Sequence, residues 1–180
     1  MRSAAEETER LSRLAEDLLL LARADQGQLP IRAARVSVPE LLDRVRIRFS
    51  TYAAELGRPV DVETAGEPAV LADALRVEQA VGNLVSNALE HGDGAVVLQS
   101  RTVDGRVEIH VTDEGQGFPE QFVARAFDRF SRADGARVSG GSGLGLAIVE
   151  LIARAHGGDA HVANRHGGGS DAWISLRRAS

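Results

Sequence analysis

The spacing of apolar residues along the chain predicts five helices. Near the N-terminus, leucines recur at alternating steps of three and four, which predicts a helix over about 3–25 with a narrow apolar seam. Three further amphipathic runs and one short segment predict the remaining helices, over 37–56, 73–91, 144–155 and 119–126.

Capping residues mark the starts of two of these helices. Ser37 precedes a proline in the first turn, and Glu40 lies at the capping-box spacing from it. Asp73 is a preferred N-cap residue ahead of the long run that ends at His91. We therefore expect both helices to begin with a side-chain cap.

Alternation of apolar and polar residues predicts strands between the helices. The expected strands cover 60–64, 69–71, 95–103, 106–112, 159–163 and 171–176. Asp104 and Gly105 join two of them and favour a type I′ hairpin turn, which makes that pair antiparallel. Helices and strands mix without a regular β-α-β alternation, so the expected fold class is α+β, one helical layer on one sheet, preceded by one N-terminal helix.

The leucine seam of the N-terminal helix needs a partner, because an apolar stripe is costly to leave in water. The helix either packs on the domain that follows it or pairs with the same helix of a second copy. The seam is narrow, which favours pairing, so we expect a homodimer contact through this helix.

Composition excludes several kinds of chemistry. The 21 basic residues of the 180-residue chain are all arginine, and cysteine is absent. The chain therefore has no P-loop lysine, Schiff-base lysine, cysteine nucleophile, disulfide or cysteine-ligated zinc. Its net charge of -5 argues against general nucleic-acid binding. No stretch approaches the roughly 18 consecutive apolar residues of a membrane span, so we expect a soluble, cytoplasmic chain without membrane contact.

A polar strip lies on the helix over 73–91. Asn83 and Asn87 are four residues apart and share one face, which Glu90 and His91 extend by a turn. Amide oxygens at this spacing can ligate a hard cation such as magnesium, or its waters, beside a nucleotide. A solvated helix face is the alternative interpretation.

Two glycine-rich segments are candidate nucleotide contacts. Asp113 to Gly117 follows a strand, where the carboxylate can accept a hydrogen bond from an exocyclic amine and the glycines can let a flat base approach. Gly141 to Leu146 opens a helix, which aims free N–H groups at an anion. Arginines of the preceding loop, at 129, 132 and 137, could reach a polyphosphate. The alternatives are an ordinary turn and a surface loop with solubilising charges.

These segments, together with residues 127–130, occur in an order that resembles the catalytic, ATP-binding domain of bacterial sensor histidine kinases, which belong to the GHKL superfamily with the Bergerat fold. Asn-Leu-Val-Ser-Asn-Ala at 83–88 is similar to the N box of that family, and Asp113 to Gly117 to its first glycine box. Phe-Asp-Arg-Phe at 127–130 is similar to the F box, and Gly141 to Leu146 to the second glycine box.

The resemblance implies a domain organisation and a set of partners. Residues 1–27 are similar to the second helix of the dimerisation and phosphoacceptor hairpin, and 28–180 to the ATP-binding catalytic domain. A two-layer α/β sandwich is implied for the latter. The implied partners are the hairpin helix that carries the acceptor histidine, which this chain lacks, and a response regulator. The chain is thus expected to be a truncated piece of a kinase.

The resemblance also implies roles for individual residues, with ATP and Mg²⁺ as cofactors. Asp113 would hold the adenine amino group, Asn87 would ligate magnesium, and Asn83 would support the phosphate end; Asn83 and Asn87 are the expected catalytic residues. Residues 128–142 would form a lid over ATP, anchored by Phe127 and Phe130. The expected nucleotide contacts are Asn87, His91, Asp113, Gly115, Gly117, Phe130, Arg132, Arg137, Gly141, Gly143, Leu144 and Gly145.

Two departures from the family pattern sharpen the expectation. Relatives that hydrolyse ATP carry a water-activating glutamate where this chain has Asn83, and an amide is no base at neutral pH, so transfer to another acceptor is favoured over hydrolysis. None of the five histidines has the context of a phosphoacceptor. Glu90 stands where many relatives have a lysine, which leaves His91 or a lid arginine to supply that contact.

Three rival functions remain open from sequence. A GHKL ATPase would need the base that Asn83 does not provide. A noncatalytic dimerisation or regulatory module would make the glycines relics, which the intact motifs argue against. An anti-sigma-factor serine kinase is closer, but the N-terminal helix and residues 127–130 favour the sensor kinase.

Overall fold

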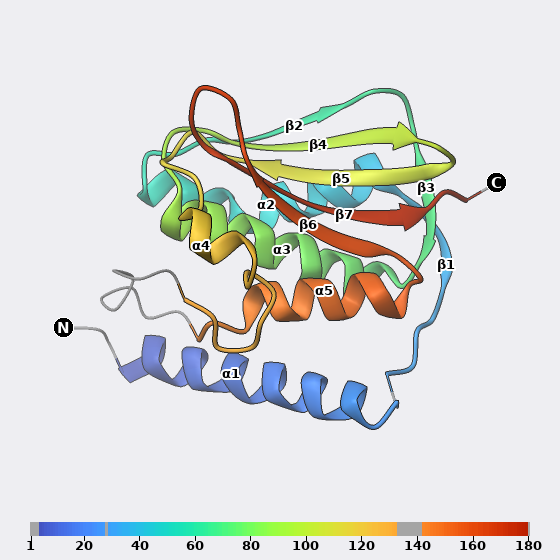
Figure 1. Ribbon diagram of the computed structural model, residues 1–180, viewed down its shortest axis with the longest axis horizontal. Coiled ribbons are helices and arrows are strands. Elements are labelled where there is room, and N and C mark those ends of the chain that lie inside the picture. The colour runs from blue at the N-terminus through green and yellow to red at the C-terminus, as the bar shows by residue number, and fades with distance from the viewer. Residues whose placement is uncertain (1–3, 28, 133–141, 180) are drawn as a thin grey trace. The chain divides into compact units, whose positions relative to one another are not determined.

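The computed structural model describes residues 4–27, 29–132 and 142–179 (Figure 1). The chain divides into two compact units, residues 1–30 and 31–180. The first contains one helix, α1, over Ala4–Asp25. Gly27, with a φ of +66°, follows the helix and donates its N–H group to the carbonyl of Ala24 at 2.9 Å. The expected N-terminal helix is confirmed, whereas the pairing of its seam stays a prediction.

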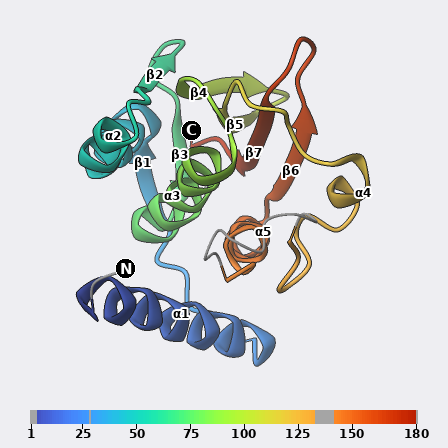
Figure 2. The same ribbon diagram turned by 90° about the vertical axis from the view of Figure 1, so that its left-hand side faces the viewer.

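The second unit is a two-layer sandwich. Its five-stranded sheet has the order β2-β4-β5-β7-β6, and one face of it is covered by the helices α2, α3 and α5 (Figure 2). The strands are β2 (Val60–Thr64), β4 (Val96–Val103), β5 (Arg106–Thr112), β6 (Asp159–Asn164) and β7 (Ser170–Arg177). The helices are α2 (Val38–Glu55), α3 (Ala74–His91), α4 (Glu120–Val123) and α5 (Gly145–Ala155). The expected α+β fold class is confirmed.

Strand pairing follows the expected hairpin. β2 and β4 pair in parallel, and the other neighbours in the sheet are antiparallel. Asp104 and Gly105, at the tip between β4 and β5, have φ angles of +48° and +76°, as a type I′ turn requires. A further strand, β1 (Ala34–Ser37), pairs with β3 (Ala69–Ala72) in a separate two-stranded sheet. The sequence analysis missed β1, because it is short and only one of its residues, Val36, is buried.

The two expected helix caps had different outcomes. The carboxylate of Asp73 accepts the N–H group of Arg76 at 3.3 Å, so that cap is confirmed. Ser37 is the residue before α2, but its side chain makes no cap hydrogen bond, so the expected capping box is wrong. Ser37 also ends β1, and the next N–H group, that of Val38, is already donated to the carbonyl of Pro68 at 2.9 Å. The third residue, Pro39, has no N–H group to cap.

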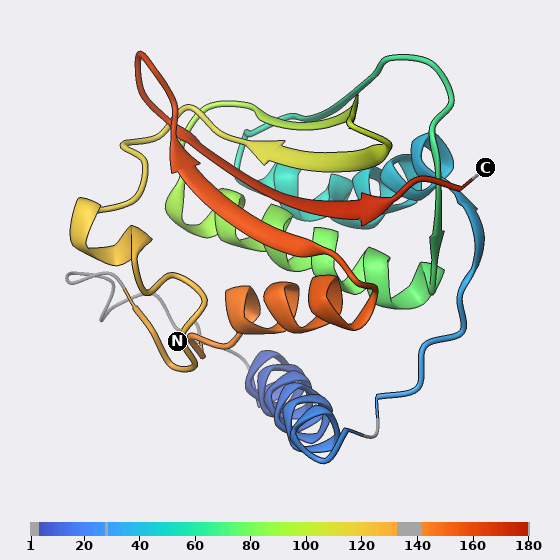
Figure 3. The same cartoon turned by 45° about the vertical axis from the view of Figure 1, so that its right-hand side comes forward.

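The core lies between the sheet and the helices and places α3 beside α5. Leucines and isoleucines from both layers are fully buried there: Leu41, Leu42, Leu84, Leu98, Ile109, Ile148, Ile152 and Ile174. Figure 3 shows α5 running beneath β6 and β7, with α3 alongside it. Among the described residues, no helix has the length and apolar character needed to cross a membrane.

Asp73→Ala should destabilise this unit. The carboxylate caps α3 and also accepts the N–H group of Arg32 at 3.1 Å, so we expect the free energy of unfolding to fall by about 1–2 kcal/mol. Denaturant unfolding measures the change. In the control Asp43→Ala, an exposed ion pair with Arg46 at 2.6 Å is lost, with an expected cost below about 0.5 kcal/mol. Equal losses in the two variants would contradict the capping role.

Candidate functional site

Asp113 is the first residue after β5, and its side chain is held by several donors. The residue is only 3% exposed. Its carboxylate accepts the Gly115 N–H group at 2.7 Å and, at the other oxygen, the hydroxyl of Ser170. Its backbone carbonyl accepts the guanidinium of Arg165 at 2.8 Å. A buried carboxylate is stable only when donors surround it, so these contacts fix where Asp113 can present its oxygens.

The C-terminal end of α3 packs directly against this carboxylate. A Cβ atom added at Gly92 would lie 2.5 Å from the Asp113 carboxyl carbon, so only glycine fits there. The next residue, Asp93, accepts the N–H group of Glu114 with its backbone carbonyl at 2.9 Å. The end of α3 and the segment after β5 are therefore joined on both sides of Asp113.

The glycines of the first glycine box have a packing reason within the protein. A Cβ atom at Gly115 would lie 2.9 Å from the Asp93 backbone nitrogen. Gly117 has a φ of +76°, and a Cβ atom there would lie 2.5 Å from the side-chain oxygen of Asn164. The Asn164 amide binds both backbone groups of Phe118, at 2.6 and 2.9 Å. These glycines are required whether or not a base approaches them.

The polar strip on α3 runs from this carboxylate toward α5. Asn83 is half-buried and donates its side-chain N–H group to the carbonyl of Gly145 at 3.2 Å. Asn87, one turn later, is also half-buried, and its amide has no hydrogen-bond partner among the residues that the structure describes. His91 is exposed a further turn along, whereas Glu90 accepts the hydroxyl of Ser86 at 2.8 Å.

The start of α5 meets the strip at Asn83. Leu144, the residue before the helix, is fully buried, and no side chain caps the helix start. Gly143 has a φ of +71°, and a Cβ atom there would lie 2.9 Å from the Phe130 backbone. The first N–H groups of a helix have no partner within it and carry a partial positive charge. This end of the strip can therefore bind an anion.

The segment before α5 departs from expectation at Phe130. The residue is 63% exposed and has a φ of +62°, so its ring does not anchor the segment, although its backbone contacts Gly143. Phe127 is half-buried. The expected anchoring pair is thus wrong for the ring of Phe130. Arg132 is exposed, and the expected contacts Arg137 and Gly141 lie outside the described residues.

The structure thus joins Asp113, Gly115 and Gly117 to one end of α3, and Gly143, Leu144 and Gly145 to the middle of the same helix. Two surface depressions lie elsewhere: one beside α2 and β2, lined by residues that include Ala53 and Arg58, and one near Leu71 and His156. Among the described residues, no group of three or more acidic or histidine side chains could hold a metal ion. A cation here would need the Asn87 amide together with oxygens of a ligand and water.

Sequence reasoning missed Ser170, Arg165, Gly92 and Asp93. Ser170 is 57 residues from Asp113 in the chain and meets it because β5 and β7 are antiparallel partners, with Thr112 opposite Asp171. The only signal was the weaker third glycine-rich turn at 167–169, just before Ser170. Strand register, which the sequence does not show, would have been needed to pair them.

Comparison with known proteins adds a family to this geometry. Residues 72–180 match the family described as histidine kinase-, DNA gyrase B-, and HSP90-like ATPase. The probable sensor histidine kinase HK of Mycobacterium tuberculosis (strain CDC 1551 / Oshkosh) is 42% identical over 98% of the chain and 46% of its own length. The sensor histidine kinase component HK1 of strain ATCC 25618 / H37Rv is 42% identical over 77% of the chain and 80% of its own length. The chain thus spans about half of the first relative and most of the second.

Solved structures have the same fold. Full-length ShkA, crystallised in complex with AMPPNP, superposes with a TM-score of 0.86 and 32% identity over 97% of this chain and 37% of its own. The catalytic domain of the histidine kinase ThkA, free of nucleotide, has a TM-score of 0.73 and 26% identity over 82% of this chain and 96% of its own.

Ser170→Ala should destabilise the protein through the Asp113 carboxylate. One buried oxygen would lose its donor, so we expect the free energy of unfolding to fall by about 1–3 kcal/mol. A double-mutant cycle with Asp113→Ala checks the cause by denaturant unfolding. The Ser170 substitution should cost much less once the carboxylate is gone, and an undiminished cost would show that Ser170 acts elsewhere.

Proposed function

The chain belongs to the family of histidine kinase-, DNA gyrase B- and HSP90-like ATPases and is the ATP-binding catalytic region of a two-component sensor histidine kinase; we propose that it binds Mg-ATP along α3 and passes the γ-phosphate to a histidine outside this chain. The observation that carries the proposal is that α3 joins both ends of the site. Its last turn packs on Asp113, and its middle contacts the start of α5.

The length of α3 between these contacts fits an extended nucleotide. Asn83 and Gly92 are nine positions apart in the chain, which is about 14 Å at the helical rise of 1.5 Å per residue. A base at one end and a triphosphate at the other can cover such a span. The helix is held rigidly in the core, so the two ends of the site keep a fixed separation.

We assign adenine to the Asp113 end. A carboxylate can accept about four hydrogen bonds, and two of these places are taken by Gly115 and Ser170. Because Asp113 is a donor-free acceptor when ionised, it selects a ligand that offers an N–H group, such as the exocyclic amine of adenine. The glycines around it keep side chains out of the base's path.

We assign the phosphates to the other end and magnesium to the point between. The uncapped start of α5, at Gly143 to Gly145, offers free N–H groups to the phosphates, with Asn83 holding that start in place. The unpaired amide oxygen of Asn87 fits Mg²⁺, which usually takes one or two protein oxygens and completes its shell with phosphates and water. His91, Arg132 and Arg137 are proposed as further phosphate contacts.

Magnesium bound there would neutralise phosphate charge during transfer, and the protein's own part is to position the nucleotide. Asn83 lies where a water-activating base would be needed for hydrolysis. Its amide cannot take up a proton, and its N–H group is engaged by Gly145. Transfer to an acceptor is therefore favoured over hydrolysis.

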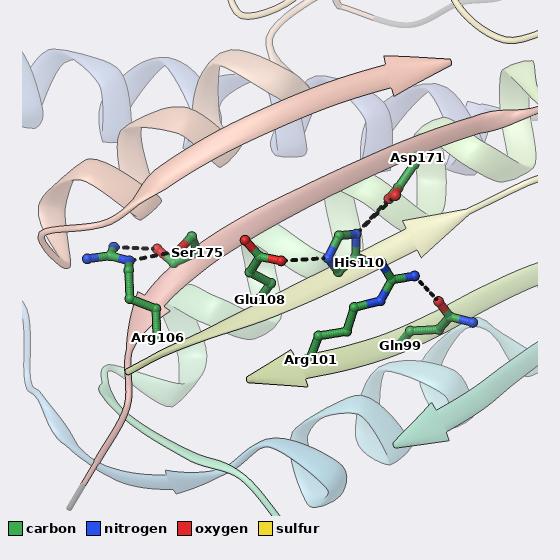
Figure 4. Close-up of polar contacts among 7 residues, drawn as sticks. All are labelled: Gln99, Arg101, Arg106, Glu108, His110, Asp171 and Ser175. Carbon is green, nitrogen blue, oxygen red and sulfur yellow. Dashed lines mark hydrogen bonds and ion pairs between the residues drawn. The ribbon is translucent and has the colours of Figure 1, made fainter. Parts of the chain in front are cut away.

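Histidines of the chain support an acceptor on another segment. Figure 4 shows His110 between Asp171 and Glu108, at 2.9 and 3.3 Å, and the residue is 3% exposed. His156 accepts the Asp73 N–H group at 3.0 Å and lies 2.7 Å from the carbonyl of Ile152. Neither ring can meet a γ-phosphate without breaking these contacts. The other three, His91, His161 and His166, lack an adjacent acidic residue.

The proposed partners follow from this assignment. We propose that residues 1–27 are the second helix of a dimerisation and phosphoacceptor hairpin, that the missing first helix carries the acceptor histidine, and that α1 forms a homodimer contact. A response regulator would receive the phosphoryl group next. Because the donor is ATP, we place the chain in the cytoplasm.

Titration calorimetry with AMPPNP tests the site. We expect saturable binding that magnesium strengthens. Asp113→Ala should weaken binding at least about tenfold, because a hydrogen bond to a charged group is lost. Asn87→Ala should remove the strengthening by magnesium but leave metal-free binding in place. Two variants on the other side of the sheet are matched controls, Asp61→Ala for the carboxylate and Gln99→Ala for the amide, and both should bind as the wild type does. Heats unchanged in Asp113→Ala would refute the proposal.

Phosphoryl transfer is tested with a separate hairpin. The phosphoacceptor hairpin of the 42% identical Mycobacterium tuberculosis relative is mixed with this chain and ATP labelled on the γ-phosphate. We expect acid-labile label on the hairpin histidine, none on this chain alone, and little free phosphate. Label that accumulates on this chain, or rapid release of phosphate without transfer, would contradict the assignment of the acceptor.

A further inference from the structure

Arg58 lies outside all of the motifs described above, in the turn between α2 and β2, and its side chain binds the end of α3. Its Nε donates to the carbonyl of Gly94 at 2.8 Å. Its Nη1 lies within hydrogen-bond distance of three more carbonyls, those of Ala88, Leu89 and Gly92, at 3.0, 2.8 and 3.1 Å. One guanidinium thus gathers four backbone carbonyls from the last turn of α3 and the residues after it.

The backbone of Arg58 is held on both sides, which fixes the origin of its side chain. α2 ends in a Schellman motif: Gly57, with a φ of +65°, donates its N–H group to Ala54, and Arg58 donates to Ala53, at 3.0 and 2.9 Å. On the other side, the carbonyl of Pro59 accepts the Val96 N–H group at 2.9 Å, where the pairing of β2 with β4 begins.

The bound carbonyls are those that a helix leaves unsatisfied. The last four carbonyls of an α-helix have no partner within it and carry a partial negative charge, which a cation at that end stabilises. His91, in the last turn of α3, is exposed and makes no contact with these carbonyls. Among the described residues, Arg58 is the side chain that caps this end of α3.

The same carbonyls lie beside the carboxylate of the site. Gly92 and Gly94 flank Asp93, whose carbonyl holds the N–H group of Glu114. The Cα atom of Gly92 and the backbone nitrogen of Asp93 approach Gly115 so closely that a Cβ atom there would lie 2.9 Å from each. Arg58 therefore fixes residues 92–94, and these residues form the wall against which Asp113 is packed.

We propose that Arg58 is a positioning residue that sets the selectivity of the site for the adenine amino group. It touches no part of the nucleotide and acts by holding residues 92–94 against Asp113. Without it, the end of α3 can move away from the carboxylate, and Asp113 loses the fixed direction in which it accepts an N–H donor. The inference rests on the function proposed above, with adenine at Asp113.

The shape of arginine is part of the inference. Its planar fork offers Nε and Nη1 to carbonyls on opposite sides, whereas a lysine ammonium is a single point that cannot span Gly94 and the turn of α3 together. Arg58→Lys keeps the charge near the helix end but loses the fork. We therefore expect the lysine variant to lie between the wild type and Arg58→Ala.

The test compares ATP with inosine triphosphate, which has a carbonyl oxygen in place of the exocyclic amine. Dissociation constants for both are measured by calorimetry with magnesium, well below the unfolding temperature of each variant. The wild type should prefer ATP by roughly tenfold or more, the contribution of a hydrogen bond to a charged group. In Arg58→Ala this preference should fall to within about twofold of equality, with binding of inosine triphosphate nearly unchanged. Arg58→Lys should retain part of the preference.

Arg46→Ala is the matched control. Arg46 is also an arginine of the α2 region, but it pairs with Asp43 on the surface and binds no carbonyl of α3. Its loss should leave the preference for ATP unchanged.

The outcomes separate this inference from the proposed function. A wild-type preference that persists in both Arg58 variants overturns the role of Arg58 alone. Weakening of both nucleotides by the same factor also overturns it, because a merely destabilised protein would lose the two together. A wild type that binds neither nucleotide, or whose preference survives Asp113→Ala, overturns the proposed function and this inference with it.

Discussion

The carboxylate of Asp113 is almost completely buried, and burying a charge requires donors on its oxygens. The chain supplies them from three places that are far apart in sequence: the loop at Gly115, the start of β7 at Ser170, and, for the backbone carbonyl, Arg165. Meeting this requirement brings together the ends of β5, β7 and α3. The rest of the site is built outward from that junction.

The helix α3 carries the consequence to the phosphate end. It is a long, straight element with one apolar side in the core, so a displacement at one end cannot be absorbed between the ends. The contact between Asn83 and Gly145 orients the start of α5 relative to the same helix. An amide at this position has two functions in the argument: it holds the neighbouring helix, and it leaves no base for water.

Local patterns predicted the elements well, because their signals are local. The spacing of leucines, the Asp104-Gly105 turn and the Asp73 cap each depend on residues within a few positions, and the structure confirms them. Ser37 failed as a side-chain cap because a distant carbonyl, that of Pro68, had already taken the neighbouring N–H group. Phe130 failed as an anchor because aromatic character alone does not show which way a ring points.

For the candidate site, sequence order found the residues that would touch a nucleotide but not those that hold them. Ser170 meets Asp113 through strand register, and Arg58 meets the end of α3 through a turn 30 or more residues away in the chain. Supporting residues of this kind need only the right reach and charge, and they can come from any element that the fold brings near. A glycine such as Gly92 shows the same limit: its requirement follows from a carboxyl carbon 2.5 Å from where its Cβ atom would be, and that neighbour is 21 positions further along the chain. The geometry that makes the site selective therefore belongs to the packed fold, and a motif by itself specifies only the groups that the packed fold holds in place.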